Sequence, residues 1–146
     1  MNANPQASVF GASEIEIAAA PNSVWDVLTD FERWPSWNPD VKSMSIAGDV
    51  RPGTEFTWKS GPASIRSTIQ RVERPSVIAW TGKTFGMSAI HVYRLEARDG
   101  RTVVRTEESF DGWLARLLRG RMQKRLQMAL DSGLRRLKTQ VEGVAL

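Results

Sequence analysis

The most informative part of the chain is residues 20–41, which read APNSVWDVLTDFERWPSWNPDV. After the turn residues Pro21-Asn22-Ser23, apolar residues recur at helical spacing, which predicts a short amphipathic helix. They are Val24, Trp25, Val27, Leu28 and Phe31. Pro35 and Pro39 then stand too close together for a long helix, because proline has no N–H and restricts the residue before it. We therefore expect a second short helix or turn, rich in tryptophan.

Strand patterns flank this segment on both sides. On the N-terminal side, Glu and Ile alternate, which predicts a strand over residues 14–18. Residues 1–12 show little periodicity, and we expect a loose N-terminal arm there, followed by a single domain over residues 13–146. On the C-terminal side, frequent Gly, Pro and Asp-Gly punctuation indicates an antiparallel meander. Its expected strands are residues 41–47, 54–60, 63–73, 76–82, 87–97 and 101–110.

The C-terminal segment has helical periodicity instead. After Gly112, apolar residues recur every three or four positions from Leu114 to Val141, which predicts one long amphipathic helix. About 28 residues at ~1.5 Å each would span ~40 Å, enough to cross a curved sheet. Gly120 is a candidate kink. Gly133 lies on the apolar stripe, where a missing side chain serves either close packing or space for a ligand.

Composition excludes several classes of function. The chain has no cysteine and one histidine, His91, so disulfides, a thiol nucleophile, an iron–sulfur cluster and a His-rich metal site are ruled out. No nucleophile elbow, dinucleotide-binding motif or P-loop occurs, and we expect no metal and no tightly bound cofactor. No run of residues is apolar enough for a membrane span, and the N-terminus does not resemble a signal peptide. We therefore expect a cytoplasmic protein.

Positive charge is concentrated at the C-terminus. Residues 1–111 hold 12 Lys/Arg and 14 Asp/Glu, a net charge of −2, whereas residues 112–146 hold 8 and 2, a net charge of +6. This excess indicates either a solvated helix face or a contact with an anionic membrane or nucleic acid. Because no nucleic-acid-binding motif accompanies the charge, nucleic acid is an unlikely partner.

Four segments of the chain resemble the helix-grip fold of the START-like (SRPBCC) superfamily, and within it the bacterial proteins similar to polyketide cyclases/dehydrases. They are residues 20–31, 33–41, 91–95 and 107–112, of which 33–41 is the most specific. The resemblance covers residues 13 to 142. It implies an α+β fold, in which a curved antiparallel sheet of about seven strands wraps around the long C-terminal helix, with two short helices after the first strand.

The same resemblance implies a cavity between sheet and helix. Such cavities bind lipids, sterols, polyketides or other apolar small molecules, in proteins that include both enzymes and transport proteins.

Strand parity supplies candidate residues for this cavity. Residues two apart on a strand point to the same face, and the expected inward sets are mostly apolar with a few polar members, which is typical of a ligand pocket. The candidates for ligand binding are Phe56, Trp58, Trp80, His91, Tyr93, Glu108, Phe110 and Gly133. Three of them are also candidate catalytic residues, namely His91, Glu108 and Tyr93. His91 and Glu108 lie on expected neighbouring strands, where a pair could orient a ligand, act as an acid/base couple or only form a structural hydrogen bond.

For the other tryptophans and for two arginines, a structural role is the first interpretation. Trp25 and Trp113 are expected to pack into the core, whereas Trp34 and Trp37 stabilise the turn or line a cavity mouth. Arg66 and Arg71 have opposite parity on one strand, so one of them could face inward and bind a ligand carboxylate. Arginines on such strands more often reach solvent.

Three hypotheses for the function follow. The first is binding of a hydrophobic small molecule or lipid between the sheet and the C-terminal helix, by a monomer or homodimer. The second is a polyketide cyclase/dehydratase type of enzyme, which needs His91 and Glu108, or Tyr93, to converge on one ligand. The third is a contact of the basic C-terminal helix with a macromolecule or membrane surface, which would weaken as salt rises.

Overall fold

Seven antiparallel strands form one curved sheet in the computed structural model, which describes residues 1–144, in the order β1-β7-β6-β5-β4-β3-β2. Strands β2 to β7 form the expected meander, and β1 adds to β7 at one edge. The strands are β1 Val9–Ile17, β2 Val41–Ile46, β3 Glu55–Ser60, β4 Ala63–Glu73, β5 Val77–Thr84, β6 Met87–Arg98 and β7 Arg101–Asp111. This sheet confirms the α+β helix-grip class.

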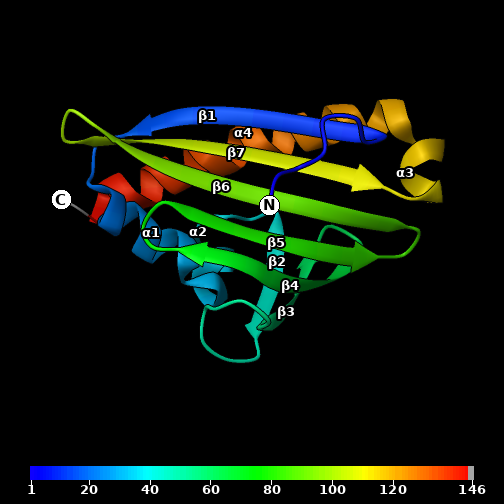
Figure 1. Cartoon of the computed structure of the whole chain (residues 1–146), viewed down its shortest axis with the longest axis horizontal. Coiled ribbons are helices and arrows are strands. Elements are labelled where there is room, and N and C mark those ends of the chain that lie inside the picture. The colour runs from blue at the N-terminus through cyan, green and yellow to red at the C-terminus, as the bar shows by residue number, and fades with distance from the viewer. Residues whose placement is uncertain (145–146) are drawn as a thin grey trace.

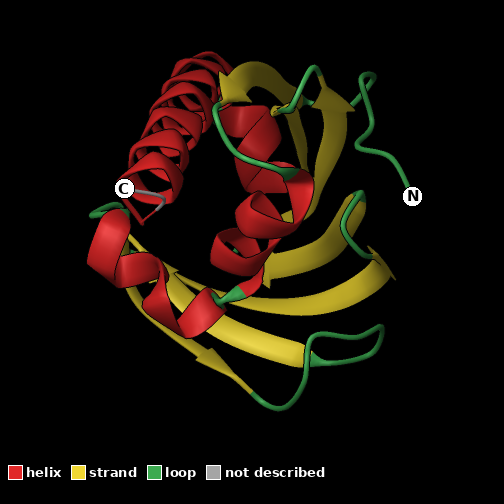
Figure 2. Cartoon of the chain, turned by 90° about the vertical axis from the view of Figure 1, so that its left-hand side faces the viewer, coloured by secondary structure: helices red, strands yellow, loops and turns green. Residues whose placement is uncertain are grey.

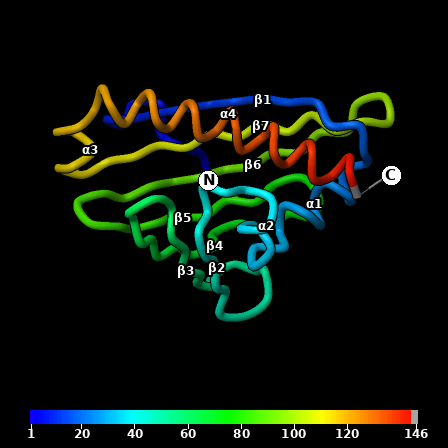
Figure 3. The backbone as a smooth tube through the Cα atoms, turned by 180° about the vertical axis from the view of Figure 1, so that it is seen from behind, coloured from blue at the N-terminus to red at the C-terminus, as the bar shows by residue number. Residues whose placement is uncertain are grey.

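The helices occupy the concave side of the sheet (Figure 2). They are α1 Pro21–Thr29, η1 Phe31–Arg33, α2 Trp34–Trp37, α3 Trp113–Leu117 and α4 Arg119–Val144. The longest, α4, packs mainly against β1 and runs from α3 at one end of the sheet to α1 at the other (Figures 1 and 3). None of these described helices combines the length and the apolar character that a membrane span needs.

The long C-terminal helix is broken once, but not at Gly120. The helical segment that begins at Trp113 ends at Leu118, which has φ −104° and caps α3, and α4 starts at the next residue. The break lies there because α3 packs on the ends of β6 and β7, whereas α4 must turn to cross the sheet. Gly120 lies in the first turn of α4, with no atom within 4 Å of the position a Cβ would take.

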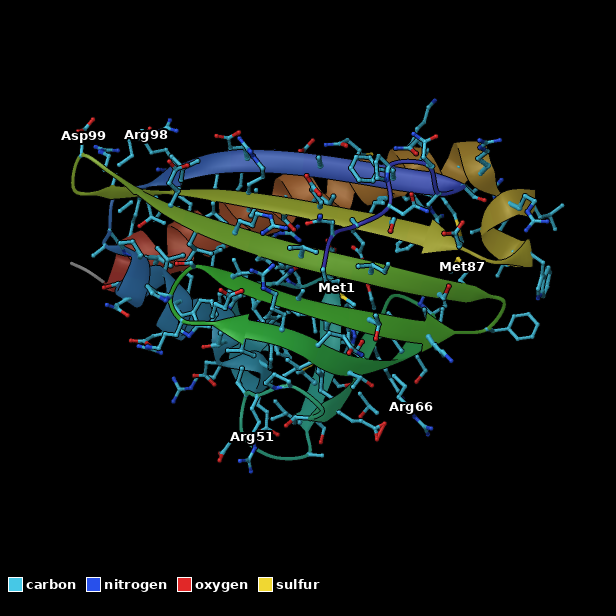
Figure 4. All side chains as sticks on the ribbon, viewed as in Figure 1. Met1, Arg51, Arg66, Met87, Arg98 and Asp99 are labelled. Carbon is cyan, nitrogen blue, oxygen red and sulfur yellow. The ribbon has the colours of Figure 1, made fainter. Side chains whose placement is uncertain are left out.

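The N-terminal residues are not a loose arm. Strand β1 begins at Val9, five residues before the expected start, and residues before it cross the convex face of the sheet, where Met1 lies in Figure 4. Ala3 is buried, and the backbone N–H of Asn4 donates to Ser109 Oγ at 3.0 Å. The reason is an apolar cluster on this outer face that would otherwise meet water, formed by Val77, Ala79 and Val92 with Ile90 packed against them.

An aromatic core lies under α1, η1 and α2. The Phe31 ring lies at 5.3 Å from the Trp34 ring and at 5.6 Å from the Trp80 ring, centroid to centroid. Trp25 is buried in the same cluster, as expected. Trp34 is also buried, and its indole N–H donates to the carbonyl of Leu28 at 2.9 Å, so the tryptophan-rich turn is held to the end of α1.

The prediction that Trp113 packs into the core is wrong. Its side chain is 56% exposed rather than packed in the core. It begins α3 at the end of the sheet. Among the described residues, the only aromatic ring beside it is that of the exposed Phe85, and the two ring centroids are 5.4 Å apart.

Gly11 sets how closely α4 approaches β1. A Cβ atom on Gly11 would lie 3.0 Å from Leu130 Cδ1 and 3.1 Å from Leu126 Cγ, tighter than ordinary packing. The missing side chain therefore lets α4 close against the β1 edge of the sheet, and the remaining space lies farther along, under β5, β6 and β4.

Candidate functional site

A cavity of about 260 Å³ lies between the concave face of the sheet and α4. Its inner wall is largely apolar and aromatic, and its few polar groups are near the centre of the sheet. The rim includes exposed residues from the α2–β2 loop, the β5–β6 hairpin and α4, among them Asp40, Lys83 and Arg125. An apolar chamber with a charged rim is the usual form of a small-molecule site.

All but one of the candidate ligand-binding residues line this cavity: Trp58, Trp80, His91, Tyr93, Glu108, Phe110 and Gly133. Phe56 does not. It shares a face with Trp58, but it stacks on Phe31 at 4.9 Å and meets Trp80 edge-on at 5.5 Å between centroids. The alternation of strand residues predicts the correct face for Phe56, but η1 covers its side chain. Phe56 therefore packs behind the residues that line the cavity.

Two further predictions concern Gly133 and the arginines of β4. Gly133 gives space rather than close packing, because the nearest atom to an added Cβ would be Asn38 Nδ2, at 4.0 Å. Neither arginine of β4 enters the cavity: Arg66 is exposed, and Arg71 forms an ion pair with Glu73. Neither arginine is therefore positioned to bind a buried carboxylate, and the cations that do line the cavity, Lys83 and Arg125, are exposed at its rim.

Sequence reasoning missed some of the lining residues. Gly82 and Ser67 face each other across β5 and β4, and a Cβ on Gly82 would lie 3.0 Å from Ser67 Oγ. Gly82 is the last residue of the expected strand 76–82, two residues from Trp80, so the alternation of that strand could have placed it on the same inward face. Asn38 lines the cavity from the α2–β2 connection, where its Oδ1 accepts a hydrogen bond from Arg136 at 3.0 Å.

His91 and Glu108 are direct partners across β6 and β7. Both side chains are buried, and His91 Nδ1 lies 3.4 Å from Glu108 Oε1. On the other side of the ring, His91 Nε2 lies 2.8 Å from Thr106 Oγ1. Since the Thr106 hydroxyl donates to the carbonyl of Val92 at 3.1 Å, it accepts from His91, and the ring proton is on Nε2.

The lone pair of His91 Nδ1 therefore faces Glu108. Within residues 1–144, Nδ1 has no well-oriented hydrogen-bond partner. The imidazole itself is held between aromatic rings, with the centroid of Tyr93 at 4.7 Å and that of Trp80 at 4.9 Å. A buried acceptor of this kind is a position where a donor group of a ligand can bind.

Burial keeps this polar group uncharged. It lowers the pKa of His91 to about 3 and raises the pKa of Glu108 to about 8, because both charged forms lose hydration. Burial and the neighbouring Glu108 also raise the pKa of Tyr93. At neutral pH the site thus holds a neutral imidazole and a protonated carboxyl group, which can donate or accept hydrogen bonds. In the part of the chain described, no three His, Cys, Asp or Glu side chains gather closely enough to hold a metal ion.

Comparison with known proteins agrees with this architecture. Residues 11–142 match the family described as polyketide cyclase / dehydrase and lipid transport, and the chain belongs to this family. No curated protein matches the sequence. The similarity to polyketide cyclases/dehydrases expected from the sequence is therefore confirmed at the level of the family.

Solved structures show the same fold at low sequence identity. A hypothetical protein from Helicobacter pylori has a TM-score of 0.84 and 17% identity, over 94% of this chain and 90% of that one. The Zhui aromatase/cyclase from a Streptomyces species has a TM-score of 0.76 and 16% identity, over 91% and 93%. A START superfamily protein from Mycobacterium smegmatis has a TM-score of 0.71 and 15% identity, over 92% and 98%.

Proposed function

We propose that this protein binds a hydrophobic small molecule or lipid in the cavity between the sheet and α4. The observation that carries the proposal is an apolar chamber whose central polar group is the uncharged pair His91 and Glu108. Burial of apolar ligand surface would supply most of the affinity, at ~25 cal/mol per Å² before the costs of association. The family match to cyclases, dehydrases and lipid transport supports a ligand of this class.

The polar pair favours a neutral oxygen on the ligand. A ligand hydroxyl can donate to the unpartnered Nδ1 of His91, and a ligand carbonyl can accept from the protonated Glu108. A carboxylate at the same depth would have to lose its hydration, because the cations that line the cavity, Lys83 and Arg125, are exposed at its rim. Alcohols, sterols and phenolic or ketonic polyketides therefore fit better than a buried fatty-acid carboxylate.

The test uses two glycines of α4. Gly133→Leu should fill the cavity from a position where an added Cβ meets no atom closer than 4.0 Å, whereas Gly120→Leu makes the same chemical change in open space. Each is titrated with fatty alcohols, fatty acids, sterols, aromatic polyketides and flavonoids, by tryptophan fluorescence and thermal shift at low and high salt. If the new side chain displaces about two ligand methylenes, affinity falls by ~1.6 kcal/mol, roughly fifteenfold.

The expected result is saturable, salt-insensitive binding of one ligand class that is weakened in Gly133→Leu and unchanged in Gly120→Leu. The proposal fails if no class binds, or if both variants bind as tightly as the wild type.

A second candidate function is catalysis of the cyclase/dehydratase type. The geometry in its favour is that the Glu108 carboxyl group, whose pKa burial raises to about 8, faces the lone pair of His91, which sets an acid and a base side by side. Glu108→Gln keeps the shape and a hydrogen-bond donor but cannot transfer a proton. Mass spectrometry of a bound polyketide should show loss of water with the wild type but not with Glu108→Gln, although both proteins bind the ligand. If the ligand is unchanged with both proteins, catalysis is excluded and ligand binding remains as the function.

A further inference from the structure

Three apolar side chains are exposed together at one end of the sheet. Phe85, at the tip of the β5–β6 hairpin, is 76% exposed, and Trp113 and Leu117, one turn apart on α3, are 56% and 72% exposed. The rings of Phe85 and Trp113 meet edge to face at 5.4 Å. We call these three residues the terminal apolar patch. Exposed aromatic side chains that lie together, rather than singly, mark an interaction surface.

The fold holds this patch in place. Gly112, with φ +114°, brings the start of α3 against the hairpin, and a Cβ there would lie 2.4 Å from the carbonyl oxygen of Gly86. The backbone N–H of Leu114 donates to the same carbonyl at 3.1 Å. The hairpin tip and α3 are therefore joined by backbone contacts, and the apolar patch is a built surface rather than a frayed end.

Unpaired positive charge follows the patch along α3 and the first half of α4. Residues 112–130 contain five Lys/Arg and no Asp/Glu. Among them Arg116, Arg121, Lys124 and Arg125 are exposed, and none of these four forms an ion pair within the described residues. The second half of α4 differs, because Lys138 pairs there with Glu142. Two of the three cations in the second half of α4, Arg136 and Lys138, are thus paired, whereas the four exposed cations nearer α3 are not.

We propose that the terminal apolar patch and the basic residues around it dock on an anionic lipid bilayer. Exposed aromatic and leucine side chains enter the boundary between headgroups and acyl chains, while Lys and Arg remain at the anionic headgroups. A second copy of the chain would bring two positive faces together. A nucleic acid would use the cations but would leave Trp113 and Leu117 without an apolar partner.

The patch borders the rim of the cavity. Thr84 and Met87 flank the hairpin tip and line the cavity, as does Arg125 from α4, and Figure 4 shows Met87 beside α3. Docking would therefore bring the cavity rim to the bilayer, where an apolar ligand could pass without crossing water. This last step rests on the proposed ligand-binding function, whereas docking itself does not.

Vesicle flotation tests the docking. The protein is mixed at low and high salt with vesicles of phosphatidylcholine alone or with phosphatidylglycerol. We expect binding to the anionic vesicles at low salt, reduced at least about tenfold in Arg121→Glu/Lys124→Glu and in Trp113→Ser/Leu117→Ser. Lys42→Glu/Arg51→Glu makes the same charge change at exposed positions on β2 and the β2–β3 loop, and should bind like the wild type.

Three outcomes would overturn the docking proposal. They are no binding to anionic vesicles, equal loss in Lys42→Glu/Arg51→Glu, or full vesicle binding by Trp113→Ser/Leu117→Ser together with equally tight binding of duplex DNA. The last would mean a contact with phosphate alone. Gly133→Leu should float as the wild type does, and the docking variants should bind ligand normally without vesicles, so failure of one proposal is distinguishable from failure of the other.

Discussion

Replacing Glu108 by Gln should stabilise the protein increasingly as the pH rises from 6 to 8. In the folded state the pKa of Glu108 is raised from 4.5 to about 8 by burial. Above pH 4.5 the unfolded chain therefore loses a proton that the folded chain keeps, so the wild-type stability falls as pH rises toward the folded pKa. A Gln at the same position has a similar shape and does not titrate.

The size of the effect follows from the width of that window. Linkage gives at most ~1.4 kcal/mol per pH unit, less near the folded pKa, so the advantage of Glu108→Gln should grow by roughly 2 kcal/mol between pH 6 and pH 8. His91, which destabilises the fold below its ordinary pKa of 6.5, is present in both proteins and cancels in the difference. Tyr93 cancels for the same reason, since its pKa is raised above 10.

Urea unfolding at pH 6, 7 and 8 measures this difference directly. Glu107→Gln is the matched control, because it lies on the same strand but points to the opposite face of the sheet. It should leave the pH dependence of the wild type unchanged. A constant difference between wild type and Glu108→Gln across this range would refute the reasoning, because Glu108 would then have to be ionised at neutral pH.

Two further predictions concern the supports of the site. Thr106→Val removes the oxygen that accepts a hydrogen bond from His91 Nε2, so the free energy of unfolding should drop by ~1–3 kcal/mol. Thr106→Ser should recover most of this loss. If Thr106→Val leaves the stability unchanged, the assignment of the ring proton to Nε2 is wrong. Gly112→Ala should destabilise the fold by ~1–3 kcal/mol and lower the melting temperature, because Gly112 has a positive φ and an added Cβ would clash with the carbonyl oxygen of Gly86. Gly48→Ala, in open space, should stay close to the wild type in the same thermal scan.

The central pair of the site could be predicted because one turn determines its register. Asp99 and Gly100 have φ of +51° and +77°, the conformation of a two-residue hairpin turn, and they lie at the tip of the β6–β7 hairpin, with Asp99 labelled in Figure 4. From Arg98 opposite Arg101, the pairing counts back to His91 opposite Glu108. The alternation of side chains then places both residues on the inward face with Tyr93.

Depth within the molecule could not be predicted in the same way. Phe56 and Trp58 have the same parity, yet η1 covers the first and leaves the second in the cavity wall. Trp113 is a large aromatic residue of the kind expected in a core, but it lies at the end of the sheet, where 56% of its side chain is exposed. Residues 1–8 have little periodicity because they follow the convex face as an irregular segment, held by contacts such as Asn4 with Ser109.

The sequence by itself determined the order of elements, the register of the β6–β7 hairpin and the alternation that puts His91, Tyr93 and Glu108 on one face of the sheet. These depend on local backbone preferences and on the period of two, which act between near neighbours in the chain. Only the tertiary structure decided how far α4 stands from the sheet, which inward residues reach the cavity, and in which direction burial shifts the pKa values of His91 and Glu108. Those properties depend on burial, which is set by segments distant in sequence, such as Gly11 against Leu130.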